Sequence, residues 1–385
     1  MKKIYLDHAA TTPVDNEVLN AMMPYFSEKF GNASSLHSFG REAKDALEAS
    51  RKKIASLINA KVSEIIFTSG GTESNNIAIK GVAFANKNKG NHIITSKIEH
   101  HAVLEPCRWL EKHGFKITYL NVDSDGLINL NELEKAITKD TILVSIMHAN
   151  NEIGTIQSIE EIGKICRNHK IYFHTDAVQS FGKEKIDARK MNIDLLSASS
   201  HKLYGPKGTG LLYVGQDVNI ESISHGGGHE HNLRSGTENI PGIVGFAKAS
   251  ELACKDMEKE NNRQKILRNK TIKKLLEIEG TKLNGHATRR LANNINVSFK
   301  NIEGEALLIR LDEKGIAAST GSACSTKSLE PSHVLSAIGL KHEQAHGSLR
   351  LTLGKENTEK DMDYVIDELI KIINSLRKIS PFKKF

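Results

Sequence analysis

The segment from Arg41 to Asn59 alternates apolar and polar residues with the period of a helix. Its apolar positions are Ala43, Ala46, Leu47, Ile54, Leu57 and Ile58. Because residues at this spacing share one face of a helix, the pattern predicts an amphipathic helix that buries one side.

The pattern then changes to short runs rich in β-branched and aromatic residues. These runs cover 65–67, 92–94, 116–119, 142–146 and 171–173. Most are separated by segments long enough for a helix, and strands that alternate with helices favour a parallel sheet with covered faces. The sequence therefore predicts an α/β fold with a mainly parallel, helix-covered sheet.

Chain length points to a second unit. A chain of 385 residues exceeds the size at which one hydrophobic core stops growing, so two domains are expected. After about Cys254 the pattern shifts to a long charged helix, followed by a second mixture of strand and helix. We predict a domain boundary near that residue.

Composition and charge exclude other classes of protein. No apolar stretch approaches the about 18 residues of a membrane helix. Asp7 follows Met1-Lys2-Lys3 before any apolar stretch forms, so we expect no export segment and a cytoplasmic protein. The formal charge is +7, but lysines and arginines are spread along the chain. This distribution indicates a solvated surface and no nucleic-acid partner.

The cysteines and histidines give no strong metal signal. Cys107, Cys166, Cys254 and Cys324 are scattered, which fits neither a disulfide framework nor a zinc module. Residues 225–231 hold three histidines and a glutamate, but the three glycines among them favour a shaped loop over a rigid ligand cage. We predict reduced thiols and no metal site.

Ligands of open α/β sheets bind beyond the carboxyl ends of the strands, so the loops after the apolar runs are the first candidates. After the first run, Gly70, Gly71 and Thr72 could hold a phosphate at a helix start, although the same residues can form an ordinary cap. Later, Asp176 could pair with the ring nitrogen of a pyridine cofactor, or could cap the next helix.

Two nucleophile candidates follow. Lys202 lies in a polar loop after Leu195-Leu196, and a lysine can form a Schiff base when its pKa is lowered. What distinguishes this lysine is that the phosphate and pyridine candidates also lie in post-strand loops. Cys324 lies in a loop of small residues, where an accessible thiol could be a nucleophile.

His100 could act on a cofactor, or could simply begin a helix.

With these residues assembled, the sequence resembles the cysteine desulfurases of the class V aminotransferase group, which are related to the nitrogen-fixation and iron-sulfur-assembly desulfurases. The resemblance runs nearly end to end. It rests on the motifs at 5–13, 70–76, 150–154, 174–179, 200–202, 234–237 and 321–324.

This resemblance implies the type I pyridoxal-phosphate-enzyme fold, a homodimer, and pyridoxal 5'-phosphate as cofactor. The large cofactor-binding domain would cover 16–255, and a small domain over 1–15 and 256–385 would carry the Cys324 loop. Lys202 would carry the cofactor, Asp176 would hold the pyridine nitrogen and His100 would stack on the ring.

The resemblance also implies the remaining contacts. Asn151 and Gln179 would face the cofactor or substrate, and Arg350 would bind the substrate carboxylate through its two-pronged guanidinium. Phosphate contacts would come from Gly71, Thr72, Ser199 and His201, with Thr237 reaching across from the partner subunit.

The implied reaction converts L-cysteine to L-alanine and leaves the sulfur on Cys324 as a persulfide. An iron-sulfur scaffold or another acceptor protein would then take the sulfur. Two alternatives stay open: a selenocysteine lyase, and a non-catalytic scaffold-binding protein that uses Cys324 as a cluster ligand. The presence of both Lys202 and Asp176 argues against the second, because a binding module needs neither.

Overall fold

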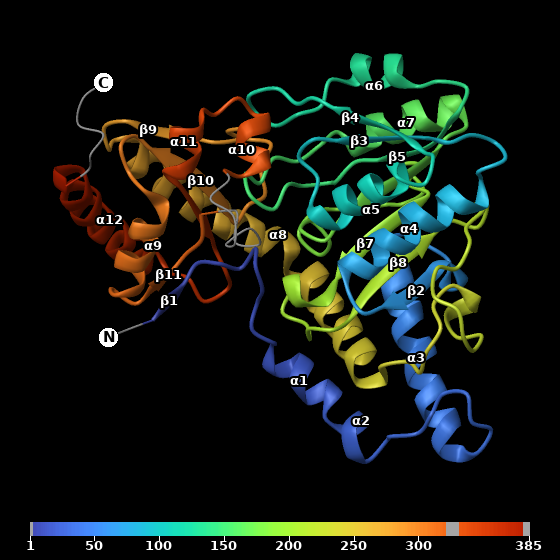
Figure 1. Cartoon of the computed structure of the whole chain (residues 1–385). Helices are drawn as coiled ribbons and strands as arrows, with labels where there is room; N and C mark the ends of the chain where they lie inside the picture. Colours follow the sequence, from blue (N-terminus) through green and yellow to red (C-terminus); the bar gives the residue numbers. More distant parts are fainter. Residues whose placement is uncertain (1–2, 321–330, 380–385) are drawn as a thin grey trace.

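The computed structural model describes residues 3–320 and 331–379. Figure 1 shows two units side by side, with both ends of the chain in the same unit. The larger unit is built around a seven-stranded sheet, and the smaller one contains a three-stranded and a two-stranded sheet. Within the described ranges, no helix combines the length and the apolar composition that a membrane crossing requires.

The large sheet is mainly parallel, as predicted. Its strands, in spatial order, are β2 (Ile65–Thr68), β8 (Gly210–Val214), β7 (Leu195–Ser199), β6 (Tyr172–Asp176), β5 (Thr141–Ser145), β3 (His92–Ser96) and β4 (Lys116–Leu120). Among these described strands, β8 runs in the direction opposite to the other six, and the remaining pairs are parallel. The predicted α/β class is confirmed, and each of the predicted apolar runs overlaps one of these strands.

Helices bury both faces of this sheet, because neighbouring residues of a strand point to opposite sides. In β3, for example, Ile93 and Ile94 belong to different core clusters. One cluster includes residues of α3 (Ser38–Leu57), α7 (Ile159–His169) and α8 (Ile240–Leu276); the other includes residues of α4 (Gly71–Ala85) and α5 (His101–Glu111). The helix predicted over 41–59 is thus confirmed as α3. The shorter elements are α1 (Asn16–Met22), α2 (Pro24–Ser27), η1 (Val62–Glu64), α6 (Leu130–Ala136), η2 (Ser200–Lys202) and η3 (Glu230–Asn232).

The smaller unit has its own core, which includes Leu6, Val297, Leu351 and Leu369. Its antiparallel sheet has the order β12 (Ser348–Thr352), β10 (Asn294–Phe299) and β9 (Thr281–Leu283), and β1 (Ile4–Tyr5) pairs in parallel with β11 (Ile316–Ala317). Its helices are α9 (Gly304–Asp312), α10 (His333–Ala337), α11 (His342–His346) and α12 (Glu359–Ile379).

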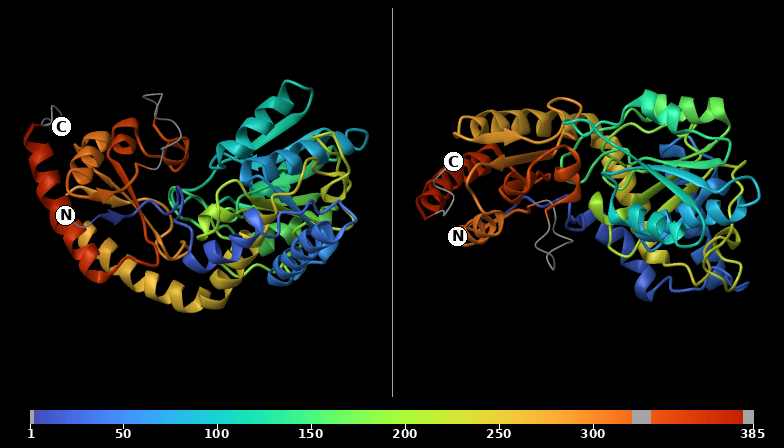
Figure 2. Two further views of the ribbon diagram at one scale, coloured as in Figure 1. Left: turned by 90° about the horizontal axis from the view of Figure 1, so that it is seen from below. Right: turned by 45° about the horizontal axis from the view of Figure 1, so that its top comes forward.

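The long helix α8 runs from one unit into the other (Figure 2). Phe246 packs in the core of the larger unit and Leu275 in the core of the smaller one. The helix begins at Ile240, where the Asn239 side chain accepts from the Gly242 N–H, so the charged helix expected after about Cys254 starts earlier. The predicted division between residues 255 and 256 lies inside α8, and the division into domains stays a prediction.

Candidate active site

One cavity brings together most of the residues predicted from the sequence. It has a volume of about 330 Å³ and lies where the loops after the parallel strands meet the smaller unit. Its lining residues are Ala9, Ala10, Gly71, Thr72, Asn75, His100, Ala102, Met147, Asn151, Asp176, Val178, Gln179, Ser199, His201, Lys202 and Arg350.

The N-terminus of α4 forms one end of this cavity. Gly70 has φ 155°, a conformation that glycine tolerates, and no side chain caps the helix. A Cβ atom on Gly71 would lie 2.5 Å from Val178 Cγ2, so any side chain here would force Val178 to move. Free N–H groups at a helix start favour an anion, and the hydroxyl of Thr72 borders the same space.

His201 lies in η2, directly after β7, and faces this end of the cavity. Its Nδ1 lies 3.2 Å from Thr11 Oγ1. Burial, followed by the charges of Lys202, Lys207 and Lys183, lowers the pKa of His201 to about 4. The imidazole is therefore neutral at physiological pH, and it offers a hydrogen bond without carrying a charge.

Lys202, the next residue, reaches the N-terminal segment. Its Nζ donates to the carbonyl oxygens of Ala9 and Ala10 at 2.5 and 2.7 Å. The Gln179 amide also donates to the Ala9 carbonyl, at 3.0 Å. These contacts hold the amine at the cavity wall in a polar environment.

Asp176 ends β6 with its carboxylate fixed in the cavity wall. One carboxylate oxygen accepts from the Val178 N–H at 2.9 Å and the other from the Asn75 amide at 2.7 Å. Each oxygen keeps further acceptor capacity toward the cavity. Asn75 Oδ1 is buried without a partner among the described residues. Sequence reasoning assigned no role to Asn75. Its position one turn into the helix that follows the glycines is the sequence feature that could have suggested a role.

His100 caps the start of α5 and also lines the cavity. The two interpretations offered by the sequence, a helix start and a cavity residue, are therefore compatible. Its Nδ1 accepts from the Ala102 N–H at 3.0 Å, which leaves the proton on Nε2. Burial lowers the pKa of His100. A neutral ring with an Nε2–H donor therefore borders the cavity.

Arg350 closes the cavity from β12 in the smaller unit. Its guanidinium donates to the Asn151 carbonyl at 3.0 Å and to Asp7 Oδ1 at 2.7 Å. Its Nε is buried without a partner among the described residues. Asp7 was not predicted as a site residue, although it lies in the first motif of the resemblance.

Cys324 lies outside the described residues, but the segment after it is anchored to the loops of the cavity. Ser332 Oγ donates to Glu152 Oε2 at 2.6 Å, and His333 Nε2 lies 2.9 Å from the Glu99 carbonyl oxygen. Burial raises the pKa of Glu99 to about 8 and that of Glu152 to about 7. Sequence reasoning assigned no role to either acid, because their burial depends on the tertiary fold.

Thr237, predicted to contact the phosphate of the partner subunit, does not line the cavity. Its side chain is exposed, in the segment between η3 and α8. The nearby glutamate of the histidine-rich loop, Glu230, is buried and accepts from Arg51 at 2.7 and 2.8 Å. This ion pair gives the loop a structural anchor.

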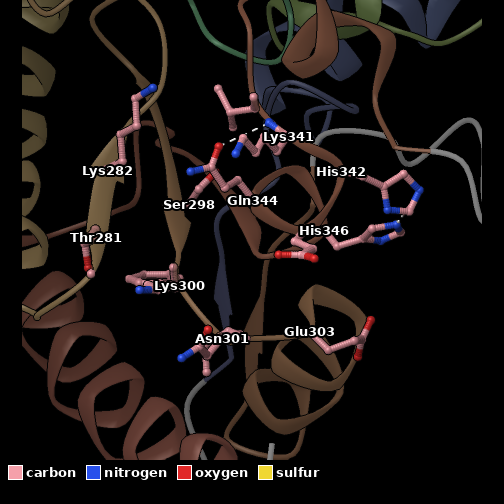
Figure 3. A pocket seen from close by; sticks show the side chains of 15 residues that line it. Thr281, Lys282, Ser298, Lys300, Asn301, Glu303, Lys341, His342, Gln344 and His346 are labelled. Atoms are coloured by element: carbon pink, nitrogen blue, oxygen red, sulfur yellow. Dashed lines mark hydrogen bonds between the residues drawn. The ribbon is translucent and has the colours of Figure 1, made fainter. Parts of the chain in front are cut away.

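A larger cavity of about 650 Å³ lies in the smaller unit and shares no lining residue with the first. Figure 3 shows its polar side chains, which come from β9, β10, the loop before α9 and α11. They include Lys282, Lys300, Lys341, His342 and His346. Neither Lys202 nor His100, the two described residues predicted to act in catalysis, lines this cavity.

The family follows from comparison of the whole chain. A family model described as aminotransferase class-V matches residues 4–365. The chain belongs to this family.

Curated relatives narrow the assignment. A protein named cysteine desulfurase IscS from Methanosarcina thermophila is 57% identical over 380 residues, which are 99% of this chain and 94% of the relative. A protein of the same name from Clostridium botulinum is 55% identical over 383 residues, with 99% and 96% covered. Within the class-V family, the chain belongs with the cysteine desulfurases, and the resemblance is confirmed.

Solved structures agree with this fold. One titled NifS-like protein has a TM-score of 0.92 and 41% identity, and the match covers 97% of this chain and 100% of the other. One titled SspA in complex with cysteine has a TM-score of 0.82 and 41% identity, with 91% and 99% covered.

Proposed function

We propose that this enzyme uses pyridoxal 5'-phosphate to convert L-cysteine to L-alanine in the cytoplasm and that it passes the sulfur through Cys324 to an acceptor protein of iron-sulfur assembly. One observation carries the proposal. A glycine-lined helix start, a fixed carboxylate, an amine and a guanidinium line one cavity, although they come from Gly71, Asp176, Lys202 and Arg350, far apart in the sequence.

The cavity suits the cofactor at each end. The N-terminus of α4, with Thr72, Ser199 and His201, would hold the phosphate. Asp176 would hold the ring nitrogen, and the buried Oδ1 of Asn75 leaves acceptor capacity nearby. Lys202 would carry the aldehyde carbon. When bound, pyridoxal phosphate supplies the electron sink that stabilises negative charge at the substrate α-carbon.

Arg350 would bind and orient the substrate. Its Nε is free among the described contacts, and the guanidinium can turn from the Asn151 carbonyl toward a carboxylate, which it can bind with two hydrogen bonds. Asn151 would face the same end. The Lys202 amine would then take the proton from the substrate α-carbon. The Nε2–H of His100 would act in the opposite sense, as a proton donor.

The sulfur step would belong to Cys324. Its thiolate would attack the substrate sulfur, so that an S–S bond forms while the C–S bond breaks. The electron pair of the C–S bond stays with the three-carbon fragment, which takes up protons and leaves as alanine. The persulfide on Cys324 then holds sulfur at the oxidation level that an acceptor thiol can receive.

A homodimer would complete the site. Large exposed apolar side chains gather on α1, α2, the start of α3 and the connections between these helices; they are Leu19, Met23, Phe26, Phe30, Leu36 and Phe39. Leu36 is 90% exposed and Phe30 65% exposed, which is typical of an interaction surface. The exposed Thr237 would reach the phosphate of the partner subunit. Light scattering should give a dimer, and Phe30→Asp should weaken it.

The function is tested by adding L-cysteine to the purified protein with pyridoxal phosphate and measuring alanine and protein persulfide. We expect both products from the native protein, and from Cys254→Ser, which removes a half-buried thiol elsewhere. Cys324→Ser should keep the colour of the bound cofactor but form no persulfide. Full persulfide formation by Cys324→Ser would contradict the assigned role of that thiol.

A further inference from the structure

A second amine shares a small cavity with Lys202. Lys183 and Lys202 both line an internal space of about 60 Å³. Lys183 belongs to the segment after β6 and Lys202 to η2, and residues of α8 form another wall. The two amines therefore approach one space from different parts of the larger unit.

The amine of Lys183 is enclosed without a protein partner. Its Nζ is out of contact with solvent, and no acceptor of the described residues lies within hydrogen-bond distance. The backbone is fixed on both sides, because the Lys183 N–H donates to the Ser180 carbonyl at 2.8 Å and the Lys183 carbonyl accepts from the Asn261 amide at 2.6 Å. An enclosed charge without a partner is unfavourable, and burial, together with the charge of Lys202, lowers the pKa of Lys183 to about 7.

Neighbouring carboxylates do not neutralise this amine. The negative charge of Glu184 favours the charged form of Lys183, but this effect is smaller than the opposing effect of burial. Asp256 is exposed, and both carboxylate oxygens of Glu260 accept from Arg263, at 2.7 and 2.8 Å. The other titratable groups that line the cavity are His8, Lys202, Tyr204 and Lys355.

The influence of Lys183 extends to the proposed phosphate end of the active site. Lys183 lines the small cavity together with Lys202, and His201, the neighbour of Lys202 in η2, lines the active-site cavity with Gly71 and Thr72 of α4. In line with this placement, the charge of Lys183 is one of those that lower the pKa of His201. Electrostatic influence is mutual, so an anion bound beside His201 must in turn favour the protonated form of Lys183.

We propose that Lys183 is a positioning residue that supplies a switchable positive charge to the anion held at the N-terminus of α4. This inference rests on the proposed function, since that anion is the cofactor phosphate. Binding of a dianion draws a proton onto Lys183, and the ammonium then stabilises the anion. Anion affinity is therefore high below the titration range of Lys183 and falls as the pH rises through it.

Inorganic sulfate tests this coupling, because it is a dianion that does not titrate near neutral pH. Its binding to the full-length chain, freed of cofactor, is measured by calorimetry in buffers of different ionisation enthalpy. We expect proton uptake by the native chain. Lys183→Met should bind sulfate about tenfold more weakly and take up less proton. Lys183→Arg, which is always charged, should keep the affinity but lose the proton uptake.

A neighbouring lysine provides the control. Lys185 has a side chain that is 80% exposed and pairs with Glu258, so Lys185→Met should behave like the native chain. Unchanged affinity and proton uptake in Lys183→Met would overturn the inference, as would an equal loss in Lys185→Met. If Lys183→Met fails to fold, Lys183→Arg decides, because native-like proton uptake in that variant would exclude Lys183 as the group that titrates.

Failure of this inference can be told apart from failure of the proposed function. Sulfate binding needs no cofactor chemistry, so a chain that takes up no pyridoxal phosphate contradicts the proposed function alone. A chain that binds the cofactor and releases alanine, while Lys183→Met matches the native sulfate affinity and proton uptake, contradicts only the role of Lys183.

Discussion

The proposed active-site cavity and the cavity within the smaller unit differ in how their polar groups are held. The smaller, of about 330 Å³, gathers side chains from the ends of several strands, from α4 and α5, and from β12 of the other unit. The larger, of about 650 Å³, lies within the smaller unit and carries Lys282 on β9, Lys300 after β10, Lys341 before α11, and His342 and His346 on α11 (Figure 3).

This contrast shows that size does not identify the chemical site. In the smaller cavity, Asp176 and Arg350 are fixed by hydrogen bonds, and each keeps capacity to bind a ligand. In the larger, no described ion pair orients Lys282, Lys300 or Lys341. Preorganised groups that converge from distant segments distinguish a catalytic site from a surface hollow.

Changing Arg350 should give the largest effect of the three tests that follow. Arg350→Lys keeps the charge beside Asp7 but loses the two-pronged donor, so kcat/KM for cysteine should fall about tenfold to hundredfold, mainly through KM. Steady-state kinetics measure this. Arg289→Lys, at an exposed arginine that donates to Ser158, is the control and should change neither constant. An unaltered KM in Arg350→Lys would remove Arg350 from substrate binding.

The buried acid beside the smaller cavity should make stability depend on pH. Because Glu99 has a raised pKa of about 8 in the folded protein, its protonated form favours folding, and this contribution is lost as the pH rises toward and through that value. Glu99→Gln resembles the protonated acid. At pH values above the pKa of Glu99, the Glu99→Gln variant should be more stable than the native protein by about 2 kcal/mol. In acid the two proteins should be equally stable.

Denaturant unfolding at a series of pH values checks this prediction. The two proteins should differ progressively more as the pH rises through the titration range. Parallel curves for Glu99→Gln and the native protein would show that folding does not raise the pKa of Glu99.

The smallest effect is expected in the larger cavity. Lys300→Ala removes an amine from its wall without touching any residue of the smaller cavity, so kcat/KM should stay within about twofold of the native value. The same cysteine assay measures it. A loss comparable with that of Arg350→Lys would mean that the larger cavity also serves the reaction.

Local sequence patterns predicted the parts of the site that follow strands. Buried parallel strands appear as apolar runs, and Gly71, Asp176 and Lys202 each lie at or just after a strand end. The direction of β8 could not be predicted, because an apolar run specifies a strand but not the strand beside which it pairs.

Contacts between the two units were beyond sequence reasoning. Asp7 meets Arg350 across the length of the chain, and only the resemblance suggested a role for Arg350. Asn75 and Glu99 take their character from burial, which depends on the packed fold. The starting point of α8 was also missed, because the charged residues that draw attention lie in its second half while Ile243 and Phe246 belong to the core of the larger unit.

We propose above all that the smaller cavity holds pyridoxal phosphate on Lys202. Treating the purified protein with borohydride fixes the cofactor to the amine that carries it, and peptide mass spectrometry then locates the added mass. We expect the label on Lys202 and an unlabelled Lys202→Ala variant. A label on any other lysine, or no label after reconstitution with the cofactor, would contradict this proposal.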